Sequence, residues 1–259
     1  MPRGTQRGSA RSPTRSRRCC CRSRGGPCST TCSTRSARSA RSTRDRIHEV
    51  DDLDEIHLVT NARFAAALRD WAPEDVTVHD DGTTSNEDRL GAIGDIAFAI
   101  EHGGLEGLDL LIVAGDNLIG YSLADFVHFW RTKGGSALAV HEVAERSLLR
   151  NYGVVELDAD DRVVGLEEKP TDPKGDLAAT ASYLYRGDHL ALLPRYFEGG
   201  NPPDAPGNFT AWLHTREPVF GYRAPGEWHD VGDLGQLLAA DNLLRERAGL
   251  PTRSEYSLS

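Results

Sequence analysis

The chain has 259 residues, a formal net charge of −9 and 39% hydrophobic residues, values typical of one large soluble domain or two small ones. No run approaches the roughly 18 consecutive apolar residues that a membrane-spanning helix needs, and the N-terminal stretch lacks the apolar centre of a secretory signal. We therefore expect a cytoplasmic protein with no membrane partner.

Residues 1–44 differ in composition from the rest of the chain. They contain twelve arginines, nine serines and all five cysteines, but no acidic residue and no Leu, Ile, Val, Phe, Trp or Tyr. Such a segment cannot bury an apolar core, so we predict a low-complexity basic segment that is disordered or frame-shifted. Its cysteines lack the spaced second pair of a zinc ribbon. Residues 45–259 retain 18 of the 30 basic residues and all 39 acidic ones, which gives this predicted domain a formal charge of about −21.

From residue 45 onward, strand-like runs alternate with helix-like runs, as expected of βαβ units around a mixed, mainly parallel sheet. Short apolar runs predict the first strands, at 56–60, 76–79 and 110–114. Apolar residues at helical spacing predict the first helices, at 62–71, 86–102 and 122–132.

The second half of the chain changes to shorter β-type runs. Further strands are expected at 137–143, 153–158, 162–167 and 180–185, with a hairpin turn at 158–161. A helix at 189–197 and a proline-rich loop at 199–207 follow, and the runs 209–214 and 219–223 lead into a turn at Trp228. The last expected element is an amphipathic helix at 234–248, which ends at Gly249.

Three charged residues stand at the ends of such runs. Asp116 follows the most apolar run, and parallel strands deliver their last residues to the edge of a sheet where ligands bind. Asp230 lies between an aromatic segment and Val231-Gly232, where a turn can present it to the same crevice. Two hard oxygen ligands suit Mg²⁺, and Lys169 offers a point charge for a phosphate. The set predicts phosphoryl chemistry.

Five motifs follow one another in an order that is characteristic when taken together. They are Gly115-Asp116-Asn117, Tyr152-Gly153-Val154-Val155-Glu156-Leu157-Asp158, Glu167-Glu168-Lys169-Pro170, Ser182-Tyr183-Leu184-Tyr185 and Trp228-His229-Asp230-Val231-Gly232. This order resembles the sugar-1-phosphate nucleotidyltransferases, the family that includes glucose-1-phosphate thymidylyltransferase. The resemblance covers residues 51–249 and implies a Rossmann-like three-layer α/β fold. It also implies an enzyme of nucleotide-sugar biosynthesis that joins a nucleoside triphosphate to a sugar 1-phosphate and releases pyrophosphate.

The resemblance also implies roles for individual residues. Asp116 and Asp230 are the expected magnesium ligands and, with Lys169, the expected catalytic residues; Asp116 also lies at the nucleotide. Lys169 is expected to contact the sugar phosphate, and Gly153 and Glu168 the sugar. These residue types suit nucleotidyl transfer, because that reaction needs in-line positioning of the reactants and positive charge over the phosphate oxygens.

The loop around Gly91 is expected near the nucleotide base. Each assignment has a structural alternative: Asp116 as a cap, Asp230 as a turn carboxylate, Lys169 and Glu168 as surface residues, and each glycine as a local backbone requirement. We expect His229 and Trp228 to be structural.

The N-terminal segment departs from the family pattern. Family members open with a strand that ends in a glycine-rich loop carrying an arginine, followed by a Pro-Lys pair, and these groups hold the triphosphate. The first lysine here is Lys133, and we expect that nothing before Ile47 could serve as a buried strand of the sheet. Gly4-Thr5-Gln6-Arg7-Gly8 lacks the strand and apolar helix that flank a phosphate loop.

Our hypothesis for this departure is a shifted reading frame. G/C-rich codons for the family-like text PLLLPVAGRPMLDHLLD, read one nucleotide out of register, can give RCCCRSRGGPCSTTCST, which is the text of residues 18–34. The domain at 45–259 would then be incomplete at its N-terminal end. Losing electrostatic stabilisers at about 3–4 kcal/mol each predicts weak or absent activity.

Two other functions fit parts of the sequence. A metal-dependent glycosyltransferase would use a nucleotide sugar, but it favours an Asp-x-Asp pair where this chain has Gly115-Asp116-Asn117. A non-catalytic binding module would have a nucleotidyltransferase-like fold without the activity. We expect no nucleic acid partner, because the arginine-rich arm lacks aromatic residues and the acidic domain repels a polyanion. The nucleotide base, the sugar and the oligomeric state are left open.

Overall fold

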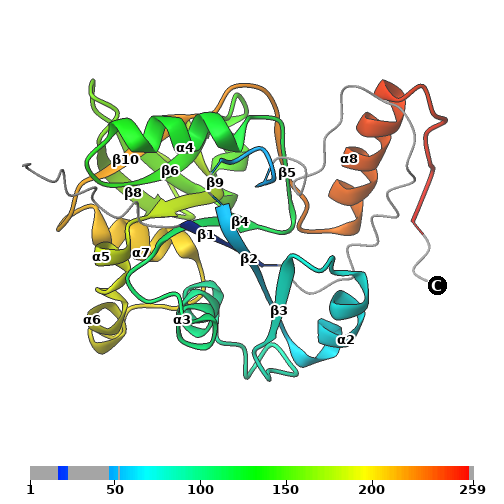
Figure 1. Cartoon of the computed structure of the whole chain (residues 1–259). Helices are drawn as coiled ribbons and strands as arrows, with labels where there is room; N and C mark the ends of the chain where they lie inside the picture. The colour runs from blue at the N-terminus through cyan, green and yellow to red at the C-terminus, as the bar shows by residue number, and fades with distance from the viewer. Residues whose placement is uncertain (1–16, 23–46, 52, 257–259) are drawn as a thin grey trace, which may run out of the picture.

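A mixed β-sheet between two layers of helices organises the molecule (Figure 1). The computed structural model describes residues 17–22, 47–51 and 53–256. The main sheet runs in the order β10-β6-β9-β4-β1-β2-β3, and a β7–β8 hairpin extends from β9. Its strands are β1 (Arg17–Arg22), β2 (Leu53–Thr60), β3 (Val76–Asp80), β4 (Asp109–Ala114), β6 (Ser136–Glu142), β7 (Gly153–Leu157), β8 (Val163–Glu168), β9 (Leu177–Tyr185) and β10 (Val219–Arg223).

The sheet combines parallel and antiparallel pairs. β1, β2, β3 and β4 are mutually parallel where they pair, and β10 is parallel to β6. β9 is antiparallel to β4, β6 and β7, and it joins the two parallel groups. The predicted mixed α/β sheet is therefore confirmed.

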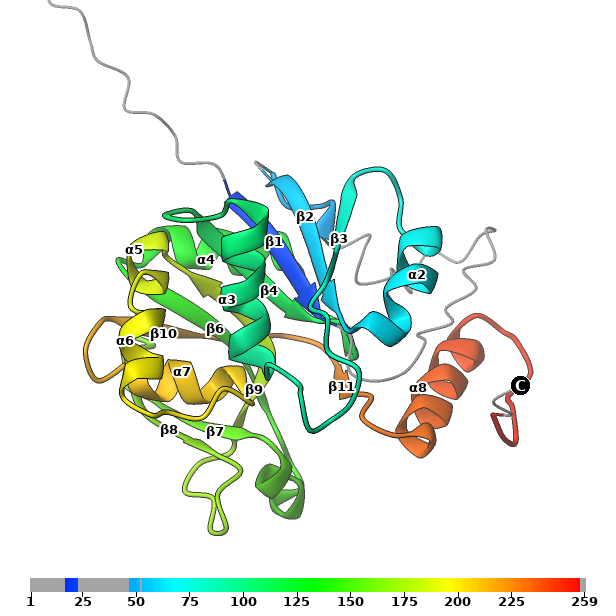
Figure 2. The same cartoon turned by 90° about the horizontal axis from the view of Figure 1, so that it is seen from below.

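Each face of the sheet has its own apolar core. Helix α4 (Leu123–Thr132) covers one face with side chains such as Phe126 and Trp130. The other face packs against four helices, and Figure 2 shows three of them in front of the sheet: α3, α6 and α7. The four are α3 (Ala92–Gly103), α5 (Gly187–Leu190), α6 (Leu193–Glu198) and α7 (Pro206–Leu213). This arrangement confirms the expected three layers.

The remaining helices lie around this body. α2 (Ala62–Trp71) packs against β3, η1 (Arg146–Asn151) precedes β7, and α8 (Leu234–Arg247) lies beyond β11 at one edge of the molecule (Figures 1 and 2). Asp233 and Gln236 form a capping box at the start of α8. Among the described helices, none combines the length and the apolar character that crossing a bilayer requires.

Most predicted elements before residue 186 are confirmed, but the helix expected at 86–102 begins six residues later. The carboxylate of Asp88 instead accepts backbone hydrogen bonds from Thr84 (3.0 Å) and Ser85 (2.8 Å) and holds the preceding segment in a turn. Gly91 then adopts a φ of 79°, which a helix cannot include. α3 therefore starts at Ala92.

The helix expected at 189–197 is divided into α5 and α6. Pro194 lies in the first turn of α6 and has no N–H to continue a helix from α5. The run 209–214 belongs largely to α7, which begins at Pro206 and shortens the predicted proline-rich loop.

The expectation that nothing before Ile47 joins the sheet is wrong for Arg17–Arg22. This segment forms β1, between β2 and β4 and parallel to both. Composition missed it because ladder hydrogen bonds use backbone groups that every non-proline residue has, whatever its side chain. The other residues of 1–44, including Cys28, Cys32 and Gly4-Thr5-Gln6-Arg7-Gly8, lie outside the described residues.

Candidate active site

A two-stranded ribbon brings the two predicted metal ligands together. After β4, the chain turns at Asp116 and forms β5 (Asn117–Ile119), which pairs antiparallel with β11 (Trp228–Asp230). Asn117 lies opposite Asp230, and the backbone N–H of Val231 donates to the carbonyl oxygen of Asp116 at 2.9 Å. The ribbon therefore holds Asp116, in the turn before β5, next to the end of β11 and Asp230, although 114 positions separate them in the sequence.

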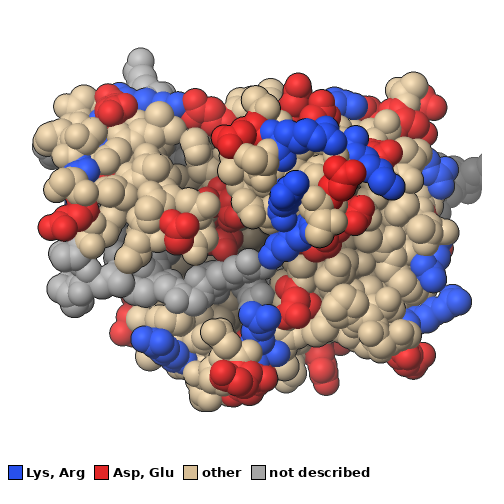
Figure 3. Space-filling view, turned by 180° about the vertical axis from the view of Figure 1, so that it is seen from behind, with Lys and Arg blue, Asp and Glu red and all other residues tan. Residues whose placement is uncertain are grey.

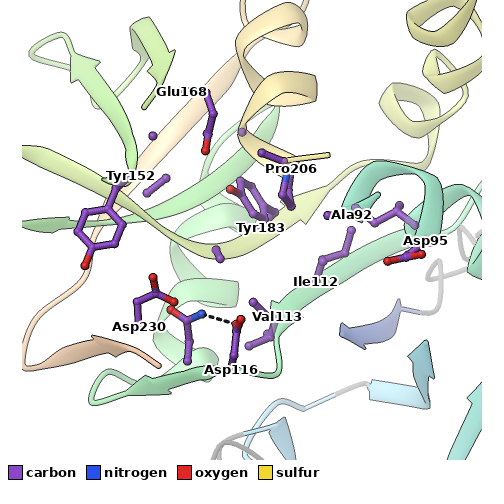
Figure 4. A pocket seen from close by; sticks show the side chains of 18 of the residues that line it. Ala92, Asp95, Ile112, Val113, Asp116, Tyr152, Glu168, Tyr183, Pro206 and Asp230 are labelled. Atoms are coloured by element: carbon purple, nitrogen blue, oxygen red, sulfur yellow. Dashed lines mark hydrogen bonds between the residues drawn. The ribbon is translucent and has the colours of Figure 1, made fainter. Parts of the chain in front are cut away.

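Both aspartates line one cavity of about 170 Å³ (Figure 4). Figure 4 shows Asp116 and Asp230 on one side of this cavity and Glu168 on the other. The lining also includes Gly153, Lys169 and Tyr152. Five of the six predicted site residues thus meet in one place.

Asn117 holds the side chain of Asp116. Its amide nitrogen donates to Oδ1 of Asp116 at 2.9 Å, and its amide oxygen accepts a hydrogen bond from Nε1 of Trp228. Asn117 is buried, so this orientation is enclosed by protein. Trp228 also contacts the ring of Tyr152 edge-on, with centroids 4.8 Å apart. Trp228 was expected to be structural. It packs against Tyr152 and also donates a hydrogen bond within the site.

The β7–β8 hairpin places Gly153, Glu168 and Lys169. Gly153 pairs directly with Glu168 across the hairpin, and the backbone N–H of Lys169 donates to the carbonyl oxygen of Tyr152 at 3.0 Å. Lys169 has a φ of 49°, in the left-handed region that non-glycine residues adopt at a cost. Such strain is often found where a side chain must be aimed at a ligand.

The cavity is lined by more negative than positive charge. Its carboxylates are Asp95, Asp116, Glu168 and Asp230, whereas Lys169 is the one basic residue among the described residues that line it. Burial, and then the charge of Asp230, raise the pKa of the Tyr152 phenol, so this hydroxyl stays protonated at neutral pH and can donate a hydrogen bond.

On the face opposite that of Figure 1, acidic side chains lie in a central recess and basic ones gather beside it (Figure 3).

The donor set suits a hard divalent cation whose coordination is completed by substrate. No cluster of three His, Cys, Asp or Glu side chains that could hold a metal occurs in the described part of the chain. Asp116 and Asp230 would supply two carboxylates and leave positions for water and phosphate oxygens. Mg²⁺ is commonly bound in this way, because it keeps several waters and uses one or two carboxylates.

Gly91 is placed differently from the other predicted residues. It is not among the residues that line the cavity, although Ala92 and Asp95 of the helix that follows it are. A Cβ at Gly91 would lie 2.5 Å from the carbonyl oxygen of Pro203, and the loop at Pro203 and Asp204 accepts the first N–H groups of α3. Close packing and a positive φ thus explain this glycine, and its predicted nucleotide contact stays a prediction.

Residues 49–247, more than half of the chain, match the nucleotidyl transferase family. The chain belongs to this family. The resemblance to sugar-1-phosphate nucleotidyltransferases noted from the five motifs is thereby confirmed, and the match favours nucleotidyl transfer over the glycosyl transfer considered as an alternative.

Curated relatives of this nucleotidyl transferase are named for different 1-phosphates and different nucleotides. It is 28% identical over 139 residues to the glucose-1-phosphate adenylyltransferase of Clostridium acetobutylicum, covering 51% of the chain and 36% of that protein. It is 26% identical over 159 residues to the valienol-1-phosphate guanylyltransferase of Streptomyces hygroscopicus subsp. limoneus, covering 57% of the chain and 42% of that protein. The chain thus matches about two fifths of the length of these relatives.

Solved structures share the fold. A Bacillus anthracis protein assigned as a glucose-1-phosphate thymidylyltransferase, crystallised with sucrose, superimposes with a TM-score of 0.60 at 18% identity, over 78% of this chain and 80% of that one. An apo UDP-glucose pyrophosphorylase gives a TM-score of 0.65 at 16% identity, over 79% of this chain and 85% of that one.

The structure of this nucleotidyl transferase adds lining residues that had not been singled out for the site. Asp95 comes from α3, Tyr183 from β9, and Pro206 and Gly207 from the first turn of α7. The Pro-Gly pair before an apolar run is a signal for a helix start, and Asp95 is conspicuous as a carboxylate in an apolar helix. Ala181 has no such signal: its φ of 53° inside β9 depends on tertiary structure.

His229 lies in the ribbon but away from the cavity lining. Its Nε2 is 3.6 Å from the carboxylate of Glu227. This position agrees with the structural role expected for it.

Proposed function

We propose that this nucleotidyl transferase joins a nucleoside triphosphate to a sugar 1-phosphate. An oxygen of the sugar phosphate attacks the α-phosphorus, the bond between that phosphorus and the α–β bridging oxygen breaks, and pyrophosphate leaves with the bond electrons. The observation that carries the proposal is the meeting of Asp116, Asp230, Glu168 and Lys169 around one cavity within the region that matches the family.

The acceptor would be held by the β7–β8 side of the cavity. Lys169 would pair with the sugar phosphate and orient its attacking oxygen, and this positioning accounts for much of the rate in phosphoryl-type transfers. Glu168 would accept hydrogen bonds from sugar hydroxyls, and Gly153 leaves room beside it. Tyr152 would donate its phenolic proton in a hydrogen bond at the same edge.

The carboxylates of Asp116 and Asp230 would hold Mg²⁺, which supplies positive charge over the reacting phosphate oxygens when bound. Asn117 would keep Asp116 in the required orientation. We also propose a cytoplasmic location, where nucleoside triphosphates and Mg²⁺ are available. The relatives use different nucleotides, so the base is to be determined by experiment.

We further propose that turnover is slow in this chain. Among the described residues that line the cavity, Lys169 alone carries positive charge, and it is assigned to the acceptor. A triphosphate with four negative charges would then rely on the cation, and one missing electrostatic stabiliser costs about 3–4 kcal/mol of transition-state free energy.

Pyrophosphate release tests this proposal. The purified chain is incubated with MgCl₂, glucose 1-phosphate and each common nucleoside triphosphate in turn, and the nucleotide sugar is identified by mass spectrometry. Formation of both products supports the proposal. Absence of nucleotide sugar with every triphosphate, at concentrations where the chain is folded by circular dichroism, contradicts it.

A further inference from the structure

Two glycines from different elements enclose the carboxylate of Glu168. A Cβ on Gly153 would lie 2.9 Å from Oε2 of Glu168, and a Cβ on Gly207 would overlap the same oxygen. Gly153 is the cross-strand partner of Glu168, whereas Gly207 comes from a helix 39 positions further along the chain. Oε2 of Glu168 can therefore lie where it does only because residues 153 and 207 are both glycines.

Gly207 also brings the carboxylate next to the start of a helix. It is the second residue of α7, after Pro206, and α7 packs against β8. The N-cap residue, Ala205, has no side chain that could cap the helix. The positive end of the helix dipole favours a negative charge here, and the carboxylate of Glu168 lies beside it.

Crowding at Gly207 would move Glu168 and leave the helix in place. The overlapped atom is the far end of a flexible side chain, which can rotate away, and a Cβ at position 207 would otherwise make only an ordinary contact of 3.8 Å with Leu166. A side chain at position 207 would thus displace the carboxylate and not the backbone of a neighbouring element.

We propose that Gly207 is a positioning residue for the acceptor: the absence of a side chain there sets the place at which Glu168 reads the hydroxyl groups of the sugar phosphate. This inference rests on the proposed function, and it extends the acceptor site from the β7–β8 hairpin to the first turn of α7. A larger residue at position 207 shifts the hydrogen-bond acceptor and changes which sugar phosphates fit.

The test compares Gly207→Ala with Gly134→Ala. A Cβ at Gly134 meets no atom within 4 Å and its φ is not positive, which makes it a matched control. For Gly207→Ala we expect the KM for glucose 1-phosphate to rise about tenfold, as for one misplaced charged hydrogen bond, while the KM for the triphosphate stays unchanged and the melting temperature does not fall. Gly134→Ala should change neither KM and should not lower the melting temperature. An equal rise in both KM values would overturn the proposal.

A double-mutant cycle shows whether the effect passes through Glu168. Glu168→Ala should raise the acceptor KM by itself, and adding Gly207→Ala should raise it no further. If Gly207→Ala has its full effect in the Glu168→Ala background, the proposal is wrong. If the unmodified chain forms no nucleotide sugar, the proposed function fails instead, and calorimetric binding of glucose 1-phosphate to the same four proteins decides the inference. Binding weakened by Gly207→Ala only when Glu168 is present supports it, and unchanged or absent binding overturns it.

Discussion

The two halves of the cavity are built in different ways. The acceptor half consists of the β7–β8 hairpin, β9 and the first turn of α7, and it contains Lys169, Glu168 and Tyr152. The opposite half is lined by β2, β4 and α3, where apolar residues such as Val59 and Ile112 surround Asp95. One half of the cavity thus has the positive charge that an anionic acceptor needs. The described residues of the other half supply no positive charge for a triphosphate. The described residues therefore account for acceptor binding better than for triphosphate binding.

The largest effect is expected from restoring the nucleotide half. If residues 1–44 come from a shifted frame, expressing the gene with that region in the alternative frame should restore a glycine-rich loop and a Pro-Lys pair. Two recovered stabilisers at about 3–4 kcal/mol each predict a gain in kcat/KM of at least about ten-thousandfold, measured by pyrophosphate release. An alternative frame without these motifs, or a repaired chain no faster than the present one, would eliminate the frame hypothesis.

The acceptor half is tested by removing its cation. Lys169→Met should lower kcat/KM for the sugar phosphate by a factor of about 100 to 1,000, because the attacking phosphate loses its one basic partner there. Lys174→Met is the matched control, since Lys174 lies in the same loop, is exposed and does not line the cavity. Comparable losses in the two variants would assign the effect to the loop and not to Lys169.

A smaller effect is expected where the two halves meet, at the hydrogen bonds that orient Asp116. Trp228→Phe keeps an aromatic ring against Tyr152 but removes the Nε1–H group that donates a hydrogen bond to the amide oxygen of Asn117. We expect kcat to fall about tenfold, the value of one hydrogen bond that supports a charged group. Trp71→Phe, at an exposed position on α2, should leave kcat unchanged. Full activity in Trp228→Phe would show that Asp116 needs no such support.

The acceptor half was more predictable from the sequence for a physical reason. Gly153, Glu168 and Lys169 lie in one hairpin, whose turn at Asp158 and alternating pattern are local signals. β1 could not be recognised, because backbone pairing leaves no trace in composition. Gly207 could not be assigned either, since its importance comes from a contact with Glu168 that exists only after α7 has packed on β8.

The smallest predicted effect concerns the backbone of β9 in the acceptor half. Ala181 has a φ of 53°, at a cost of about 1–2 kcal/mol for a residue with a Cβ. Ala181→Gly removes this cost but adds about 0.4–1 kcal/mol of unfolded-state entropy, so the net gain should be about 0.5–1 kcal/mol. Thermal unfolding should show a melting temperature raised by about 1–4 °C. Ala178→Gly, in the same strand without a positive φ, should lower it.

The central claim is that Asp116 and Asp230 share one divalent cation, and Mn²⁺ binding tests it most directly. Binding is followed by electron paramagnetic resonance in the unmodified chain, in Asp116→Asn, in Asp230→Asn and in the control Asp172→Asn, which changes an exposed carboxylate away from the cavity. We predict one Mn²⁺ site whose affinity falls at least about tenfold in each of the first two variants and is kept in the control. Unchanged Mn²⁺ affinity after loss of either aspartate would contradict the claim.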